Sequence, residues 1–96
     1  MISSKQRSKL RSLAHHLKPL INIGKAGITD GCLKSISEAL DSHELIKIKF
    51  LQNKAAKKDL KDRINDDINA SIIGEIGNTL IVYKQNEDKD KRKYSV

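Results

Sequence analysis

The sequence predicts an α/β protein: one compact domain with the element order αβαβαββ, in which helices pack on a small four-stranded mixed sheet. The length of 96 residues suits one domain with a single hydrophobic core. Apolar residues at helical spacing alternate along the chain with short strand-like segments. The single cysteine, Cys32, excludes a disulfide framework, and no apolar run is long enough to cross a membrane.

The first helix is predicted over residues 4–16, followed by a short strand. Ser3 and Ser4 are typical N-cap residues. An apolar stripe follows at helical spacing, formed by Leu10, Leu13, Ala14 and Leu17. Pro19 ends the helix because proline has no backbone N–H to donate, and Leu20–Ile23 is typical of a short strand.

A second helix is predicted to begin at Thr29 or Asp30 and to run to about His43. Its inward face consists of Ile28, Cys32, Leu33, Ile36, Ala39 and Leu40. Residues 44–51 then alternate between apolar side chains and lysines, which is typical of a strand with one buried face.

A third helix is predicted over residues 55–68, with an apolar side formed by Ala56, Leu60, Ile64 and Ile68. We expect the lysines on its other faces to be solvated and balanced by Asp59 and Asp62. Two further strands, 71–76 and 79–84, are joined by Gly77-Asn78, a two-residue hairpin signal. Gly74 indicates a bulge or a close backbone approach.

The chain is expected to form a domain over residues 1–84 and a disordered tail over 85–96. The tail is highly charged and almost free of apolar residues, so it has little apolar surface to bury.

The positive charge is concentrated near the N-terminus. The net charge is +7. Residues 1–34 hold seven Lys or Arg and one acidic residue, whereas residues 35–96 are nearly balanced. A concentration of this kind indicates a binding face for a polyanion. An organellar transit peptide is the alternative, but the segment continues without a cleavage-like break into the pattern of a folded domain.

No motif for catalysis is recognisable. The sequence has neither a GxxxxGK[ST] nor a GxGxxG phosphate-binding pattern. The spacing of His15, His16, Cys32 and His43 matches no zinc site, and Cys32 lies on an apolar stripe. We therefore expect a protein that is not an enzyme, with no catalytic residue, metal, cofactor or small-molecule substrate.

The Gly24-Lys25-Ala26-Gly27 loop is the most informative motif. Its glycines permit positive φ and let a ligand approach the backbone, and the following helix N-terminus suits a phosphate. Lys25 adds a cation, and a GxxG loop is the device with which KH domains clamp nucleotides. The alternative is a tight connector with a solvated lysine.

The candidate RNA-binding residues combine this loop with lysines and arginines around it. They are Gly24, Lys25, Ala26, Gly27, Arg7, Arg11, Lys18, Lys34, Lys47 and Lys49. Solvated strand lysines are the alternative interpretation of Lys47 and Lys49.

Several motifs in order resemble the CRM domain (chloroplast RNA splicing and ribosome maturation), including its free-standing bacterial YhbY-type members. They are Leu10–Pro19, Ile23–Thr29, His43–Lys49 and Gly77–Leu80, within about residues 3–84. The resemblance implies a fold similar to the C-terminal domain of translation initiation factor three. It also implies RNA binding through the GxxG loop, and association with precursors of the large ribosomal subunit. Lys84 departs from the family, whose members often carry Arg at this place.

The sequence thus predicts a cytoplasmic, monomeric protein that binds structured RNA, with ribosomal RNA of large-subunit precursors as the expected partner and no membrane association. A DNA-binding protein is one alternative, although no helix-turn-helix signature is present. The others are an interaction module that docks on a ribosomal protein or assembly factor, and a small enzyme that acts on RNA.

Overall fold

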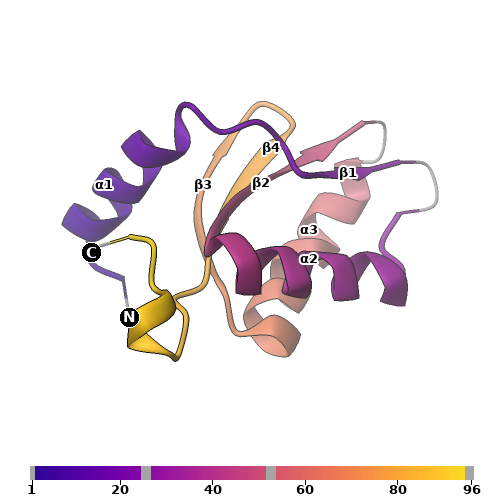
Figure 1. The fold of residues 1–96 in the computed structure, drawn as a ribbon. Coiled ribbons are helices and arrows are strands. Elements are labelled where there is room, and N and C mark those ends of the chain that lie inside the picture. Colours follow the sequence, from indigo (N-terminus) through magenta and orange to yellow (C-terminus); the bar gives the residue numbers. More distant parts are fainter. Residues whose placement is uncertain (1, 25–26, 52–53, 95–96) are drawn as a thin grey trace.

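The computed structural model describes residues 2–24, 27–51 and 54–94. The predicted element order is confirmed (Figure 1). The elements are α1 (Ser4–Ala14), β1 (Ile21–Ile23), α2 (Asp30–His43), β2 (Leu45–Phe50), α3 (Lys54–Arg63), the π-helical turn η1 (Ile64–Ile68), β3 (Ser71–Ile76), β4 (Thr79–Tyr83) and the 3₁₀ turn η2 (Lys89–Lys91). None of the helices in these described segments has the length and apolar character needed to cross a membrane.

The four strands form one mixed sheet in the order β1-β2-β4-β3. β1 is parallel to β2, and the other neighbours are antiparallel. A parallel pair needs a crossover, which α2 supplies between β1 and β2. The predicted α/β class with a four-stranded mixed sheet is therefore correct.

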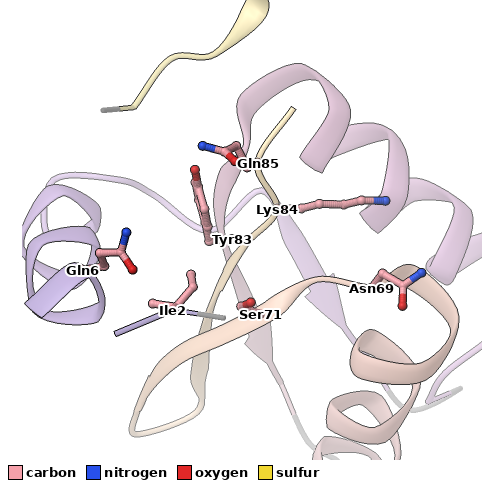
Figure 2. Close-up of a pocket in the computed structure, with 7 residues that line it drawn as sticks. All are labelled: Ile2, Gln6, Asn69, Ser71, Tyr83, Lys84 and Gln85. Atoms are coloured by element: carbon pink, nitrogen blue, oxygen red, sulfur yellow. The ribbon is translucent and has the colours of Figure 1, made fainter. Parts of the chain in front are cut away.

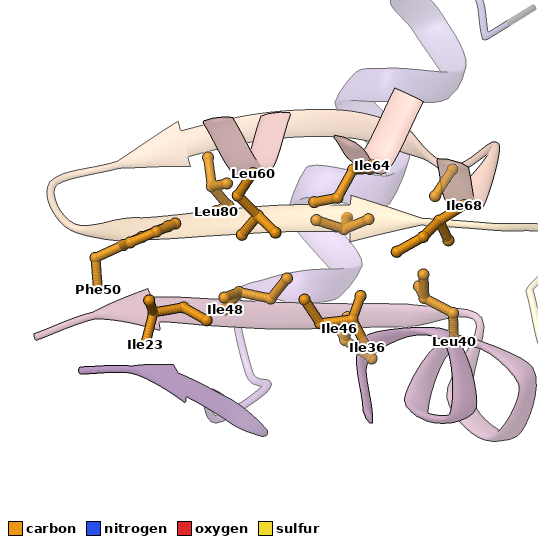
Figure 3. Close-up of a cluster of buried hydrophobic side chains, with 12 residues drawn as sticks. Ile23, Ile36, Leu40, Ile46, Ile48, Phe50, Leu60, Ile64, Ile68 and Leu80 are labelled. Carbon is orange, nitrogen blue, oxygen red and sulfur yellow. The ribbon is translucent and has the colours of Figure 1, made fainter. Parts of the chain in front are cut away.

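The sheet separates two apolar clusters because its strands alternate. The larger cluster joins α2, α3 and η1 to one face of the sheet, where Figure 3 shows its side chains. The smaller cluster joins α1 to the opposite face through Leu10 and Ala14, which contact Leu45, Ile73 and Ile81 among others. α1 therefore packs on part of the opposite face.

The hairpin β3–β4 contains the irregularity that Gly74 indicated. The pairing register shifts between Ile72 and Gly74, so a bulge is present. A Cβ atom on Gly74 would lie 3.2 Å from Nε of Arg11, tighter than most real contacts. The bulge expected at Gly74 is confirmed, and the close neighbour of its backbone is the side chain of Arg11.

The third helix differs from the continuous helix expected over 55–68. α3 ends at Arg63 and the chain continues as η1, which stops at Asn69 with a left-handed φ of 59°. The wider turn still buries Ile64 and Ile68. The lysines are also not balanced within the helix alone, because Lys57 and Lys61 lie 2.8 and 2.5 Å from Glu75 carboxylate oxygens on β3.

The expectation of a disordered tail is wrong for residues 85–94. The carboxylate of Glu44, which is fully buried, accepts a hydrogen bond from Asn86 N at 2.7 Å and another from Lys93 N. Tyr94 packs against the cluster beneath α1. A composition poor in apolar residues misleads here because the segment is held through its backbone N–H groups by a carboxylate from another part of the chain.

Candidate nucleic-acid interface

The Gly-rich loop follows directly from β1 at the edge of the sheet. Ile23 O accepts a hydrogen bond from Leu51 N at 2.9 Å, which fixes the start of the loop beside the end of β2. Gly27 N donates to Gly24 O at 3.1 Å and closes a turn. Lys25 and Ala26, which the sequence also places in the site, lie outside the described residues.

The two glycines meet different structural demands. Gly27 has a φ of 72°, in the left-handed region that favours glycine. Gly24 is not among the glycines with positive φ, and apart from its chain neighbours no described atom lies within 4 Å of the place where its Cβ would be. The fold therefore explains a glycine at position 27, whereas at position 24 the missing side chain leaves open space above the backbone.

The N-terminus of α2 lies three residues after this turn. Thr29 caps the helix, and its hydroxyl accepts a hydrogen bond from Cys32 N at 3.1 Å. The N–H groups of Asp30 and Gly31 have no acceptor among the described residues. Asp30 offsets part of the positive potential here, while the exposed Lys34 adds to it one turn further along the helix.

Lys47 and Lys49 lie on the face of the sheet that α1 covers. They alternate with the buried Ile46 and Ile48 on β2 and therefore point to the opposite side. Lys49 is paired with Asn22 of β1, two residues before Gly24. This exposed lysine thus occupies the part of the sheet nearest to the loop.

Arg7 and Arg11 have a structural role that the sequence did not reveal. Arg7 donates to the carbonyl oxygens of Ile72 and Ile73 at 2.6 and 3.4 Å, and Arg11 donates to Ile73 O at 3.5 Å. These carbonyls lie at the bulge of β3, which is an edge strand. Both arginines thus satisfy backbone groups at the bulge, and only their remaining N–H groups can reach a ligand.

The described histidines and the cysteine do not gather into a cluster of metal-ligating side chains. His15 and His16 are exposed at the end of α1, with ring centroids 5.4 Å apart, and Lys18 is exposed in the connection that follows. Cys32 packs against the larger cluster, and burial raises the pKa of its thiol. Across the described segments, no three His, Cys, Asp or Glu side chains gather where they could hold a metal ion.

A separate hollow of about 240 Å³ lies at the C-terminal end of β4, beside Tyr83 and Lys84 (Figure 2). It is lined by Ile2, Gln6, Asn69, Ser71, Tyr83, Lys84 and Gln85. Burial, and to a smaller extent the nearby Glu44 carboxylate, raise the pKa of the Tyr83 phenol. None of the described candidate site residues lines this hollow.

The structure therefore divides the predicted site into three groups. Gly24, Gly27 and Lys34 surround the turn before α2, Lys47 and Lys49 lie on the open sheet face, and Arg7, Arg11 and Lys18 belong to α1 and its C-terminal connection. Sequence reasoning did not find the role of Glu44. The only signal is its position between a helix and a strand, which many exposed residues share.

These features define a class: small α/β domains with a mixed sheet, one helix on one face, and a glycine turn beside exposed lysines. Within that class, the model of the CRS1 / YhbY (CRM) domain family matches residues 2–84, and the chain belongs to this family.

Two relatives have similar length and carry RNA-binding names. "Probable RNA-binding protein YqeI" of Bacillus subtilis (strain 168) is 39% identical over 89 residues, which are 92% of this chain and 93% of the relative. The "RNA-binding protein" of Haemophilus influenzae is 36% identical over 88 residues, 91% and 89% of the two chains.

A solved structure has the same fold. The solution structure of SAV1595 from Staphylococcus aureus is 32% identical and superposes with a TM-score of 0.78, covering 99% of this chain and all of that one.

Proposed function

We propose that this protein binds structured RNA without catalysing a reaction, and that its target is ribosomal RNA in precursors of the large subunit. The turn from Gly24 to Gly27 would approach the phosphates, and Lys25, Lys34 and Lys49 would neutralise them. The names of the relatives support RNA as the ligand. The target within the ribosome is what the likeness to the CRM family implies.

The observation that carries this proposal is the open space at Gly24. Among the described residues, nothing requires a glycine at position 24, because its φ is not positive and the place of its Cβ is open. Its missing Cβ would instead allow a ligand to approach the backbone. The concentration of basic residues in the N-terminal third indicates that this ligand is a polyanion.

Phosphate contacts of this kind position the RNA but carry little sequence information. Specificity would therefore depend on the shape of the RNA and on its unpaired nucleotides. A DNA duplex, with its different groove geometry, should bind more weakly than structured RNA of equal length.

The test is a fluorescence titration of wild type and Gly24→Asp with a structured fragment of large-subunit ribosomal RNA, and with a DNA duplex of equal length as a second ligand. We expect Gly24→Asp to lower RNA affinity at least about tenfold, because it places a side chain and a negative charge in the path of the phosphates. Its free energy of unfolding should change by less than about 1 kcal/mol, since the position is open.

Asn65→Asp is the matched control, because it adds the same charge at an exposed position of η1. It should leave RNA affinity within about twofold of wild type. Equal affinity of wild type for RNA and DNA, or an unchanged RNA affinity of folded Gly24→Asp, would contradict the proposal.

A further inference from the structure

A hollow of about 440 Å³ lies between α1 and the part of the sheet that α1 leaves uncovered. Its lining combines side chains of α1 and of the sheet, among them Arg11, His15, His16, Lys47, Ile76 and Ile81. A smaller hollow of about 170 Å³ adjoins it, shares Lys47, Ile76 and Ile81 with it, and extends it towards Pro19 and Thr79. Sites for small organic groups typically enclose roughly 300–1,000 Å³, so the larger hollow has room for one such group.

The floor of the hollow is aliphatic. Ile81 is buried in the cluster beneath α1, and Ile76, two residues beyond Gly74 on β3, is 62% exposed. The 11-residue α1 leaves this end of β3 uncovered, since Ile76 stays exposed beside it. The floor therefore offers apolar surface that the fold itself does not bury.

The rim of the hollow is aromatic and cationic. The imidazole rings of His15 and His16 meet edge to face, with an interplanar angle of 77°. Nζ of Lys47 donates to His15 O at 3.5 Å, and Arg11 holds Ile73 O through one N–H group at the same distance. These long contacts orient the two cations yet leave most of their donors for a ligand. No acidic side chain is among the described residues that line the hollow.

We propose that this hollow binds one unpaired nucleobase of the RNA, an inference that rests on the proposed function. A nucleobase has apolar faces and polar edges, which match the aliphatic floor and the ring of N–H donors. Unpaired bases in RNA loops and bulges are recognised by stacking on rings such as histidine or on an arginine plane. The adjoining phosphates would meet Arg11 and Lys47.

The hollow and the glycine turn share one surface. Lys49 lies two residues beyond Lys47 on the same face of β2, at a spacing of about 7 Å. Its partner on β1 is Asn22, which directly precedes Ile23 and the turn. An RNA strand held at Gly24 can therefore follow these side chains to the hollow, which is the reason to expect a base in it.

The experiment compares two RNA hairpins that differ only in one bulged nucleotide, by fluorescence anisotropy with wild type, Ile76→Ser and His16→Ala. We expect wild type to prefer the bulged hairpin about tenfold, in the range of one stacked base. Each variant should lose most of this preference. Leu13→Ser is the control: it changes an apolar residue on another side of α1, 39% exposed and outside the lining, and should keep the preference.

Equal affinity of wild type for both hairpins overturns the inference, as expected if the hollow instead docks a protein segment. A full preference retained by folded Ile76→Ser and His16→Ala overturns it too. Gly24→Asp distinguishes a failure of this inference from a failure of the proposed function, because it should lower the affinity for both hairpins by the same factor. If wild type binds neither hairpin, or if Gly24→Asp changes neither affinity, the proposed function fails and the inference fails with it.

Discussion

Gly24 and Gly27 are equivalent in the motif but not in the molecule. At Gly27 the backbone itself demands glycine, since a left-handed conformation costs other residues roughly 1–2 kcal/mol. At Gly24 the backbone makes no such demand. A substitution at Gly27 therefore mixes strain with any loss of binding, whereas a substitution at Gly24 tests binding alone.

Glu44 shows how one residue can order a segment far away in sequence. It occupies a positive φ of 62° between α2 and β2, where its own N–H closes the helix on Leu40 O. Its carbonyl accepts from Lys84 N at 2.8 Å, and its carboxylate accepts from Asn86 and Lys93. A buried carboxylate is tolerated here because both of its oxygens have donors.

Replacing Glu44 with alanine should release residues 85–94. The change removes both acceptors, so the N–H groups of Asn86 and Lys93 must turn to water and the tail must leave the core. We expect a loss of roughly 1–3 kcal/mol in the free energy of unfolding. Amide hydrogen exchange at Asn86 and Lys93 should accelerate much more than exchange in β2.

Glu44→Gln is the matched control, because glutamine has the same shape but only one carbonyl oxygen. It should retain one of the two hydrogen bonds and show intermediate exchange. Unchanged protection of both amides in Glu44→Ala would mean that the tail is held by Tyr94 and its neighbours instead.

At the scale of elements, α1 stabilises the edge of the sheet as well as covering it. Its apolar side packs through Leu10 and Ala14, while Arg7 and Arg11 satisfy the carbonyls freed by the bulge in β3. Unpaired edges invite pairing with other chains, and side chains bound there reduce this hazard. The basic character of α1 is thus partly a feature of the fold.

The opposite face has its own link to β3. Glu75 pairs with Lys57 and Lys61, one turn apart on α3. Hydrogen bonds from these two ammonium groups lower the pKa of Glu75 from 4.5 to about 2, and the bond from Lys57 has the larger effect. These surface ion pairs connect the helix to the strand on the side away from the proposed interface.

This lowered pKa gives a pH dependence with a defined sign. Because the folded value lies below the unfolded one, the contribution of Glu75 to stability is complete above about pH 4.5 and disappears as the pH falls towards 2. The difference in unfolding free energy between wild type and Glu75→Gln should therefore be constant near neutrality and vanish near pH 2. Urea denaturation across this pH range measures it.

Glu38→Gln serves as the comparison, since Glu38 is exposed on α2 and belongs to none of the described ion pairs. A pH profile that is the same for both variants would show that the Glu75 pairs do not contribute in solution.

At the scale of the whole molecule, the two faces of the sheet have different surroundings. One face is closed by α2, α3 and η1 over the larger cluster. The other is covered only in part by α1. Its open part carries Lys47, which lines the hollow, and Lys49, which lies between Lys47 and the glycine turn. The proposed interface therefore extends over one side of the protein, which is consistent with several phosphate contacts.

Salt dependence measures how many contacts form. Neutralising about six phosphates predicts a slope near −4 to −5 when log affinity is plotted against log salt concentration. Lys49→Ala should flatten this slope by about 1. Lys89→Ala in the tail removes an equal charge away from the interface and should leave the slope unchanged. A slope near zero for wild type would contradict a phosphate-dominated interface.

Much of the fold was predictable because its signals are local. The apolar spacing of Leu10 and Ala14, the alternation along β2 and the Gly77-Asn78 turn each depend on side chains a few residues apart. Leu13, which the same spacing placed on the buried stripe, is instead 39% exposed. The π-helical end of α3 and the ordering of the tail were not predictable, since both depend on contacts with distant residues. For the same reason the sequence could not show that Lys57 and Lys61 pair with Glu75.

The sequence by itself determined the class of fold, the element order, the family and the concentration of positive charge in residues 1–34. Local periodicity, capping residues and composition are sufficient for these. Only the tertiary structure decided which glycine has open space at the place of its Cβ, which cations are engaged by the backbone, and which face of the sheet stays partly open. These properties depend on how separate elements meet in space, and a hydrogen bond such as that from Arg7 to Ile72 leaves no local pattern in the chain.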